Sequence, residues 1–507
     1  MGGIDRFGVR AVLAGLAALV LAAGCAGPKH AAGQEFPADL ASTVDRIIRA
    51  DIDAGLIPGA SVAIIDPERG TFSRAYGLAD ANSGRQASVG DHYRVGSITK
   101  TFVATALLRL ADAGRLSLDD RLSKYVDGIP NGDTITVRAL LGMRAGVYDF
   151  SHDPEFVPQV DAAAPDHAWS TEDALRIIRT HPDKAQPPDT VTDYSNSGYL
   201  LLGMVLEKVT GRPIRDVIDD LAHDEGLPDT VYPADATLPA PESRGYAYEH
   251  DVRTDVTTRT PPSVWGGAGS LVSTVTDLAA YAPLLGEGSG LKPETQRART
   301  TFTTGTVFSA GLEYGLGIMR EGSWIGHTGA VLGYTAVVMY LPERKVSIAI
   351  ASNQYTPLYG SLLSLNSDSL WYNLVAQLYP GTLPGTDKAP PPTPPLPAPT
   401  DLNAELREAL DPSITAAAKR IRIADTDRDP DLITKLAQAY TKLAITVTVD
   451  KTNVVGHGMF ATTSTTSPQG NAPMLIPFTP VDGAWLLDHD WSCAQLAAVR
   501  ETSPACT

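Results

Sequence analysis

The stretch that decides the fold is SITK, from Ser97 to Lys100, which is followed directly by the apolar run TFVATALLRLADA, from Thr101 to Ala113. This run predicts a helix that ends at Gly114, because glycine commonly terminates helices. Residues three apart share a helix face, so the Lys100 ammonium can reach the Ser97 hydroxyl. A nearby cation helps a serine to lose its proton, which makes Ser97 a candidate nucleophile.

The Ser-x-x-Lys spacing is weak evidence by itself. Ser289 and Lys292 match it equally, but they lie between glycines and before Pro293, so we interpret that segment as a loop. For Ser97 the alternative is an ordinary helix cap. Further elements are therefore needed to choose between the two readings.

A second element is Tyr194-Ser195-Asn196, which precedes an apolar helix predicted from Tyr199 to Val209. A tyrosine beside a lysine ammonium can be held as a phenolate or can relay protons, and so can serve as a general base. Asn196 can orient Lys100 and bind a substrate amide. The alternative is a buried tyrosine followed by an asparagine cap.

A third element is the segment WIGHTGA, from Trp324 to Ala330, just before a predicted strand. Its small residues let a substrate lie against the strand edge. The backbone N–H groups of Ser97 and Ala330 are candidate donors to the oxyanion of a tetrahedral intermediate. His327, Thr328, Gly329 and Ala330 are therefore candidate substrate-binding residues, although a lone histidine is more often structural.

In this order, the three elements resemble the motifs of class C β-lactamases, D-alanyl-D-alanine carboxypeptidases and family VIII esterases, a group similar to penicillin-binding proteins. The resemblance extends over about residues 40 to 380. It implies the serine β-lactamase fold, with no cofactor and no metal. It also implies an acyl-enzyme route in which Ser97 attacks a carbonyl, Tyr194 and Lys100 move the proton, and water releases the acid.

Two departures from the family pattern bear on the substrate. His327 stands where β-lactamases usually have lysine, and Ala330 stands where many relatives that bind a carboxylate have serine or threonine. Thr328 and a protonated His327 then remain as carboxylate donors. We therefore expect an esterase or DD-peptidase type of hydrolase acting on small acyl esters, acyl-peptides or peptidoglycan-derived substrates, rather than an efficient β-lactamase. A binding protein of the cell envelope that keeps this fold without catalysis is the alternative.

The N-terminus predicts export. Arg6 and Arg10 precede a charge-free run from Ala11 to Ala23, which is too short to span a bilayer but suits a signal peptide at 1–24. Small residues directly before Cys25 resemble a bacterial lipobox, although the usual leucine sits one place nearer the cysteine than Leu21 does. We expect lipidation at Cys25, a tether at 25–36, and location on the outer face of the cell membrane, in the periplasm or the cell wall. A buried N-terminal helix is the alternative.

The remaining cysteines and the net charge agree with this compartment. Cys493 and Cys506 are candidates for a disulfide in an oxidising environment, with two free thiols as the alternative. The net charge of -17 gives no support to a nucleic-acid partner.

A proline-rich linker at 381–401 divides the chain, with eight prolines between Pro384 and Pro399. Before it, at 37–380, predicted hairpins (61–65 with 71–76, and 333–340 with 346–351) and a helix around Leu370 to Leu378 indicate an α+β fold. We expect an antiparallel sheet flanked by helices, with an all-helical region inserted at about residues 100 to 260.

The segment 402–507 predicts a small α+β domain. Helices are expected at 401–410 and 430–442, and strands at 444–449, 454–463, 474–478 and 483–487. This segment resembles the low-molecular-weight secreted mycobacterial antigen family, which implies no chemistry. It is a candidate site for a protein partner.

Overall fold

The computed structural model describes residues 36–53, 55–156, 169–182, 185–190, 192–249, 252–304, 313–355, 367–384, 386, 394–455, 458–468, 470–498 and 501–506. The predicted signal peptide, Cys25 and the tether up to residue 35 lie outside these residues. Among the described helices, none combines the length and the hydropathy that crossing a bilayer requires.

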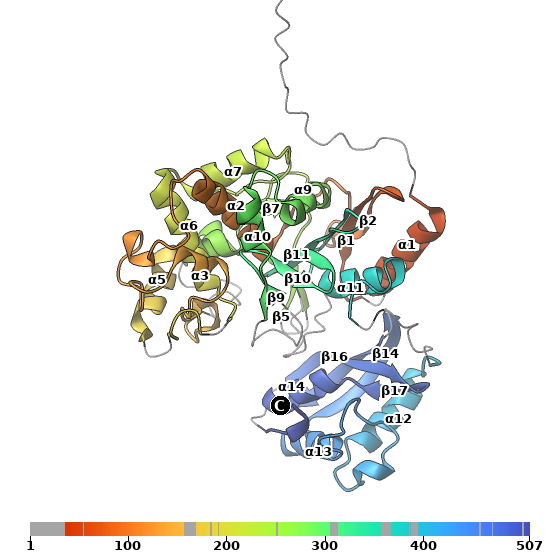
Figure 1. The fold of residues 1–507 in the computed structure, drawn as a ribbon. Helices are drawn as coiled ribbons and strands as arrows, with labels where there is room; N and C mark the ends of the chain where they lie inside the picture. The colour runs from red at the N-terminus through yellow and green to blue at the C-terminus, as the bar shows by residue number, and fades with distance from the viewer. Residues whose placement is uncertain are drawn as a thin grey trace, which may run out of the picture.

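A nine-stranded antiparallel sheet forms the centre of the first domain (Figure 1). Its order is β3 (Arg85–Gln86), β2 (Gly70–Asp80), β1 (Gly59–Asp66), β13 (Val346–Ser352), β12 (Tyr334–Leu341), β11 (Trp324–Val331), β10 (Met319–Glu321), β9 (Glu313–Tyr314) and β8 (Thr303–Thr304). Both predicted hairpins are confirmed, as β1 with β2 and β12 with β13. The hairpins join through β1 and β13, where Val62 lies opposite Ile350.

Both faces of the central strands β1, β13 and β12 are buried. The helices α1 (Ala38–Asp53) and α11 (Ser367–Leu378) pack on one face against Val62, Val337 and Ile350. The neighbouring residues of the same strands, such as Ala63 and Val338, face the larger core that contains the inserted helices. Because both faces are covered there, β12 is apolar almost throughout.

The inserted region is mainly helical, as predicted. It contains η1 (Gly96–Ile98), α2 (Thr99–Asp112), η2 (Leu122–Lys124), α3 (Val137–Leu141), η3 (Phe150–His152), α5 (Thr171–Thr180), α6 (Asn196–Thr210), α7 (Ile214–Asp224), α8 (Pro262–Trp265) and η5 (Gly266–Ala268). The prediction of an all-helical region is wrong in one respect, because β5 (Tyr246–Glu249) and β6 (Val252–Asp255) pair within it. The next helices are α9 (Val275–Glu287) and α10 (Pro293–Arg299), and Ser289 lies in the loop between them, as expected.

A pair of short strands also connects the segment just before Ser97 to the end of the inserted helical region. β4 (Tyr93–Arg94) pairs with β7 (Val272–Ser273), so Arg94 lies opposite Val272. This pairing brings residues just before Ser97 beside the end of the inserted region.

The second domain is α+β, with its own core. It contains α12 (Pro399–Ala409), η6 (Ala416–Ala418), α13 (Leu432–Lys442), α14 (His489–Ala498) and η7 (Pro504–Cys506). Its sheet has the order β14 (Thr446–Val455), β15 (Gly458–Ser467), β16 (Gly470–Val481) and β17 (Ala484–Leu487). Cys493 and Cys506 form the predicted disulfide.

Two expectations for this domain are corrected. The strand expected at 454–463 does not exist as one element, because β14 continues to Val455 and β15 begins at Gly458. The helix α14 was not expected at all. The described end of the linker lies against this domain, since Trp485 Nε1 donates to the Pro395 carbonyl at 3.1 Å and Thr452 Oγ1 to that of Pro397 at 2.9 Å.

Candidate active site

The Ser-x-x-Lys segment begins with a tight turn. Ser97 lies in η1, and Lys100 lies in the first turn of α2. Lys100 is fully buried, whereas Ser97 is half-exposed. Lys100 Nζ lies 2.9 Å from Ser97 Oγ, so the structure brings the two predicted residues into hydrogen-bond contact.

Two glycines let β11 approach this turn. A Cβ atom on Gly329 would lie 2.0 Å from the carbonyl oxygen of Val95 and 3.2 Å from the backbone nitrogen of Ser97. Gly96 has a φ of +51°, and a Cβ atom on it would lie 2.7 Å from the backbone nitrogen of Ala330. The two candidate oxyanion donors, Ser97 and Ala330, therefore belong to segments in close contact.

The hydrogen-bond partners of Lys100 determine how its side-chain amine can act. Nζ donates to Asn196 Oδ1 at 2.8 Å and to the carbonyl oxygen of Ala268 at 2.8 Å. Both oxygens can only accept, so a neutral amine keeps two N–H bonds to them and turns its lone pair toward Ser97. Burial lowers the pKa of Lys100 to about 7, against the opposing effect of the Asp149 carboxylate. Lys100 is therefore suited to accept the proton of Ser97 near neutral pH.

Tyr194 also lies beside Lys100. Its ring centroid is 4.7 Å from Lys100 Nζ, and a side-chain hydrogen bond links it to Ser97. Burial raises the pKa of Tyr194 well above its usual value, and this outweighs the lowering effect of that hydrogen bond. Of the two roles considered for Tyr194, the phenolate is disfavoured, and a neutral phenol that relays a proton remains.

Asp149 belongs to the site but was not found by sequence reasoning. Its Oδ2 accepts from the backbone N–H of Asn196 at 3.0 Å, and its Oδ1 accepts from that of Ser151 at 2.9 Å. The side-chain Nδ2 of Asn196 donates to Ser151 Oγ at 3.0 Å, which leaves Oδ1 facing Lys100. The sequence carries little sign of this role, because Asp149 lies in none of the three motifs and reaches Asn196 only through the fold.

His327 is buried and neutral. Its Nδ1 lies 2.5 Å from the carbonyl oxygen of Thr328, so Nδ1 carries the hydrogen, and Nε2 then accepts from the Tyr314 hydroxyl at 3.1 Å. Burial, followed by the charge of Lys100, lowers the pKa of His327 to about 3. The expectation of a protonated His327 that binds a carboxylate is therefore wrong.

The other residues of the third motif differ in their exposure to solvent. Thr328 is half-exposed and Ala330 is exposed, whereas Gly329 is buried against the nucleophile turn. Thr328 is then the side-chain donor that remains of the two expected carboxylate donors. The described residues contain no group of three or more His, Cys, Asp or Glu side chains placed to hold a metal ion.

Two family models match the chain. The model described as Beta-lactamase matches residues 44–362, which is more than half of the chain and includes the whole of this site. The model described as Low molecular weight antigen MTB12, C-terminal domain, matches residues 395–503.

Individual relatives match part of the chain. Protein flp of Staphylococcus aureus (strain MW2) is 32% identical over 187 residues, which are 36% of each chain. A putative D-alanyl-D-alanine carboxypeptidase of Escherichia coli O157:H7 is 29% identical over 213 residues, which are 39% of this chain and 48% of the relative. The chain thus spans less than half the length of these relatives.

A solved structure matches a larger share of this chain than these relatives do. The D-stereospecific amidohydrolase from a Streptomyces species is 29% identical, with a TM-score of 0.55 over 62% of this chain and 94% of its own.

Proposed function

Because this chain belongs to the beta-lactamase family, we propose that it is a serine hydrolase that cleaves acyl esters or amides through an acyl-enzyme intermediate on Ser97. The observation that carries the proposal is the contact of Ser97 Oγ with Lys100 Nζ, whose other partners are both acceptors. A resting amine in this position has one lone pair, and Ser97 is its available proton donor.

In the proposed acylation, one proton passes in net terms from Ser97 to the leaving group by way of Lys100 and Tyr194, and the acyl carbon exchanges its bond to the leaving group for a bond to Ser97 Oγ. Neutral Lys100 accepts the Ser97 hydroxyl proton while Oγ bonds to the substrate carbonyl carbon. The oxyanion that forms is held by the backbone N–H groups of Ser97 and Ala330. The leaving alcohol or amine takes the Tyr194 phenol proton as its bond to carbon breaks, and Tyr194 recovers a proton from Lys100.

Deacylation repeats these steps with water. A water molecule attacks the acyl carbon and gives its proton to the Lys100 and Tyr194 pair, and Ser97 Oγ leaves with a proton from that pair. The product acid is released and the resting state is restored.

For the substrate class, we propose preference for small neutral acyl esters over carboxylate-bearing β-lactams and D-Ala-D-Ala peptides. Neutral His327 supplies no cation, and Ala330 offers only its backbone N–H. The relatives named as a carboxypeptidase and an amidohydrolase make acyl-peptides and amides further candidate substrates.

The proposed site of action is the outer face of the cell membrane, with Cys25 as the lipid anchor. Its support is the signal-like run before Cys25. Cys25→Ser should move the protein from the membrane fraction to the soluble fraction. Unchanged partitioning of this variant would contradict the anchor.

Labelling with a fluorophosphonate probe tests the hydrolase proposal. The wild type should be labelled and Ser97→Ala should not, whereas Ser289→Ala, which changes the loop serine of the same spacing, should keep wild-type labelling. Absence of Ser97-dependent labelling would favour the alternative, a cell-envelope protein that binds acyl-peptides without turning them over.

A further inference from the structure

Arg299 is a buried cation that the proposed mechanism does not use. It is the last residue of α10, and its side chain is fully buried, with 0% exposure. Its Nη2 lies 3.5 Å from the carbonyl oxygen of Thr101, and its Nε and Nη1 have no hydrogen-bond partner among the described residues. A guanidinium stays protonated in proteins, so a full positive charge lies in the core.

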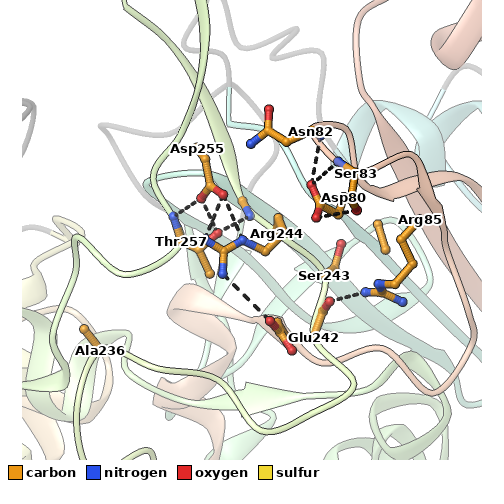
Figure 2. A network of polar contacts seen from close by, with 12 residues as sticks. Asp80, Asn82, Ser83, Arg85, Ala236, Glu242, Ser243, Arg244, Asp255 and Thr257 are labelled. Carbon is orange, nitrogen blue, oxygen red and sulfur yellow. Dashed lines mark hydrogen bonds and ion pairs between the residues drawn. The ribbon is translucent and has the colours of Figure 1, made fainter.

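Other arginines of this domain are paired with carboxylates. Figure 2 shows Arg244 bonded to Asp255, with Nε 2.8 Å from Oδ2. Arg85, which Figure 2 also labels, forms an ion pair with Asp91 at 2.9 Å. A buried charge without such a partner destabilises the folded state. Arg299 therefore calls for a role other than stability.

Three buried tyrosines interact with this cation. They are Tyr281 of α9, Tyr199 of α6 and Tyr314 of β9, and Tyr281 is also hydrogen-bonded to it. The end of α10 packs beside β9, since the backbone N–H of Leu316 donates to the carbonyl oxygen of Arg299 at 3.0 Å. The charge is thus held next to Tyr314 by its own backbone contacts.

Tyr314 links this cation to the third motif. Its hydroxyl lies 3.1 Å from His327 Nε2, and His327 Nδ1 lies 2.5 Å from the carbonyl oxygen of Thr328. Burial above all raises the pKa of Tyr314 well above its usual value, so this group is a neutral phenol that can donate. A cation attracts the oxygen of a hydroxyl and repels its hydrogen, so Arg299 favours donation from Tyr314 to Nε2.

A second arrangement of the same groups would give His327 a charge. Tyr199 donates its hydrogen to the carbonyl oxygen of Leu141 at 2.9 Å, and a side-chain hydrogen bond links it to Tyr314. If Tyr314 donates to Tyr199, its oxygen can only accept from Nε2, which must then carry a hydrogen. Because Nδ1 already uses a hydrogen for Thr328, the imidazole would become a cation.

The groups around His327 disfavour this second arrangement. After burial, the charge of Lys100 is what lowers the pKa of His327. Arg299 acts on the Tyr314 oxygen that a charged imidazole would have to share. Tyr194, whose ring centroid lies 6.2 Å from that of His327, is a neutral phenol and brings no compensating negative charge.

We propose that Arg299 and Tyr314 are positioning residues of the active site that act through His327. The buried cation sets the direction of the hydrogen bonds that run from Tyr314 through His327 to the Thr328 carbonyl, and so keeps this part of β11 in one arrangement. Thr328 lies two residues before Ala330, the candidate oxyanion donor. The inference thus deepens the proposed function, and only its kinetic test rests on that function.

NMR of the ¹⁵N-labelled full chain tests the network through the ring nitrogens of His327. The chain has ten histidines, and His327→Gln identifies the relevant signals. Arg299→Met should fold, because an apolar side chain of similar length can replace an unpaired buried charge without loss of stability. It should raise the midpoint of His327 protonation by at least about one pH unit. If His327 stays as neutral as in the wild type wherever the variant is folded, the proposal is overturned.

A double-mutant cycle tests whether Arg299 acts through the Tyr314 hydroxyl. In Tyr314→Phe no hydroxyl oxygen can accept from Nε2, so adding Arg299→Met to this variant should shift the midpoint less than it does in the wild type. An equal shift in both backgrounds means that Arg299 acts on His327 directly, and the role of Tyr314 is then wrong.

Arg94→Met is the matched control. Arg94 is also buried, with 3% exposure, but its charge interacts with Tyr334 and Asp235. This variant should leave the titration of His327 unchanged. A shift as large as that of Arg299→Met would contradict a network specific to Arg299.

A kinetic test measures the effect on the reaction and rests on the proposed function. Tyr314→Phe should lower kcat for p-nitrophenyl butyrate roughly tenfold or more with little change of KM, because the oxyanion forms only in the transition state. His327→Asn should retain more of kcat than His327→Gln, because the shorter amide places its N–H near the position of Nδ1 and can still donate to the Thr328 carbonyl. Unchanged kcat in Tyr314→Phe, or equal kcat of the two His327 variants, contradicts the positioning role. Absence of turnover in the wild type contradicts the hydrolase proposal and leaves the NMR titration to decide the network.

Discussion

Lys100 Nζ donates a 2.8 Å hydrogen bond to Asn196 Oδ1, across a gap of 96 residues in the chain. This contact joins the first two sequence motifs into one proton-handling unit. It also places an uncharged acceptor beside a buried amine, so the site gains a hydrogen bond without a negative charge that would keep Lys100 protonated.

Acylation should therefore depend on pH through Lys100. Burial lowers the pKa of this lysine to about 7, and only the neutral amine can accept the Ser97 proton. The rate of fluorophosphonate labelling should level off above the pKa and fall toward tenfold per pH unit below it. Lys100→Arg should be inactive throughout, because a guanidinium does not deprotonate. A labelling rate that is constant between pH 5 and 9 would exclude Lys100 as the base.

Asn196→Asp should move this pH profile to higher pH. A carboxylate in place of the amide stabilises the Lys100 ammonium, so its pKa should rise by at least about 1 unit. Asn196→Ala removes the same contact without adding a charge, so it should slow labelling without an alkaline shift of the profile. If the two variants have the same midpoint, the electrostatic account of the contact is wrong.

The relative kcat/KM values of different substrates should reflect how few groups near Thr328 can bind a substrate carboxylate. Losing one hydrogen bond to a charged group costs about 1.5 to 3 kcal/mol, which is roughly tenfold to more than a hundredfold in rate. We expect p-nitrophenyl butyrate to have a higher kcat/KM than nitrocefin or a diacyl-Lys-D-Ala-D-Ala peptide. If nitrocefin or the peptide leads in steady-state assays, their carboxylate is bound well, and the proposed preference for neutral esters is wrong.

The local parts of this architecture were predictable from the sequence. The helix after Ser97, the two hairpins and the contact of Lys100 with Ser97 all depend on residues close together in the chain. Such features follow from periodicity and spacing, which one sequence displays.

Features that depend on packing were not predictable. The role of Asp149 requires that its loop meet Asn196, and the need for Gly329 requires that β11 approach Val95. The neutral state of His327 follows from burial, which spacing does not reveal. The false strand at 454–463 arose because apolar and β-branched residues continue on both sides of the junction between β14 and β15.

Asp51 offers a test of stability away from the site. It follows Ile47 and Ile48 on the buried face of α1, is 1% exposed, and its carboxylate oxygens have no hydrogen-bond partner among the described residues. Burial raises its pKa to about 7. The folded state therefore keeps a proton that the unfolded chain loses near pH 4, and stability is lost as the pH rises from about 4 to 7.

Asp51→Asn should remove this loss, because the amide stays neutral at every pH. Urea unfolding of the first domain at pH 8 should show the variant to be more stable than the wild type by about 2 to 4 kcal/mol, and at pH 4 the gain should vanish. Asp53→Asn is the matched control, since residue 53 is exposed on the same helix and should change little. Equal stability of Asp51→Asn and the wild type at pH 8 would mean that Asp51 is ionised and solvated in the folded protein, and the packing of α1 described above would then be wrong at this position.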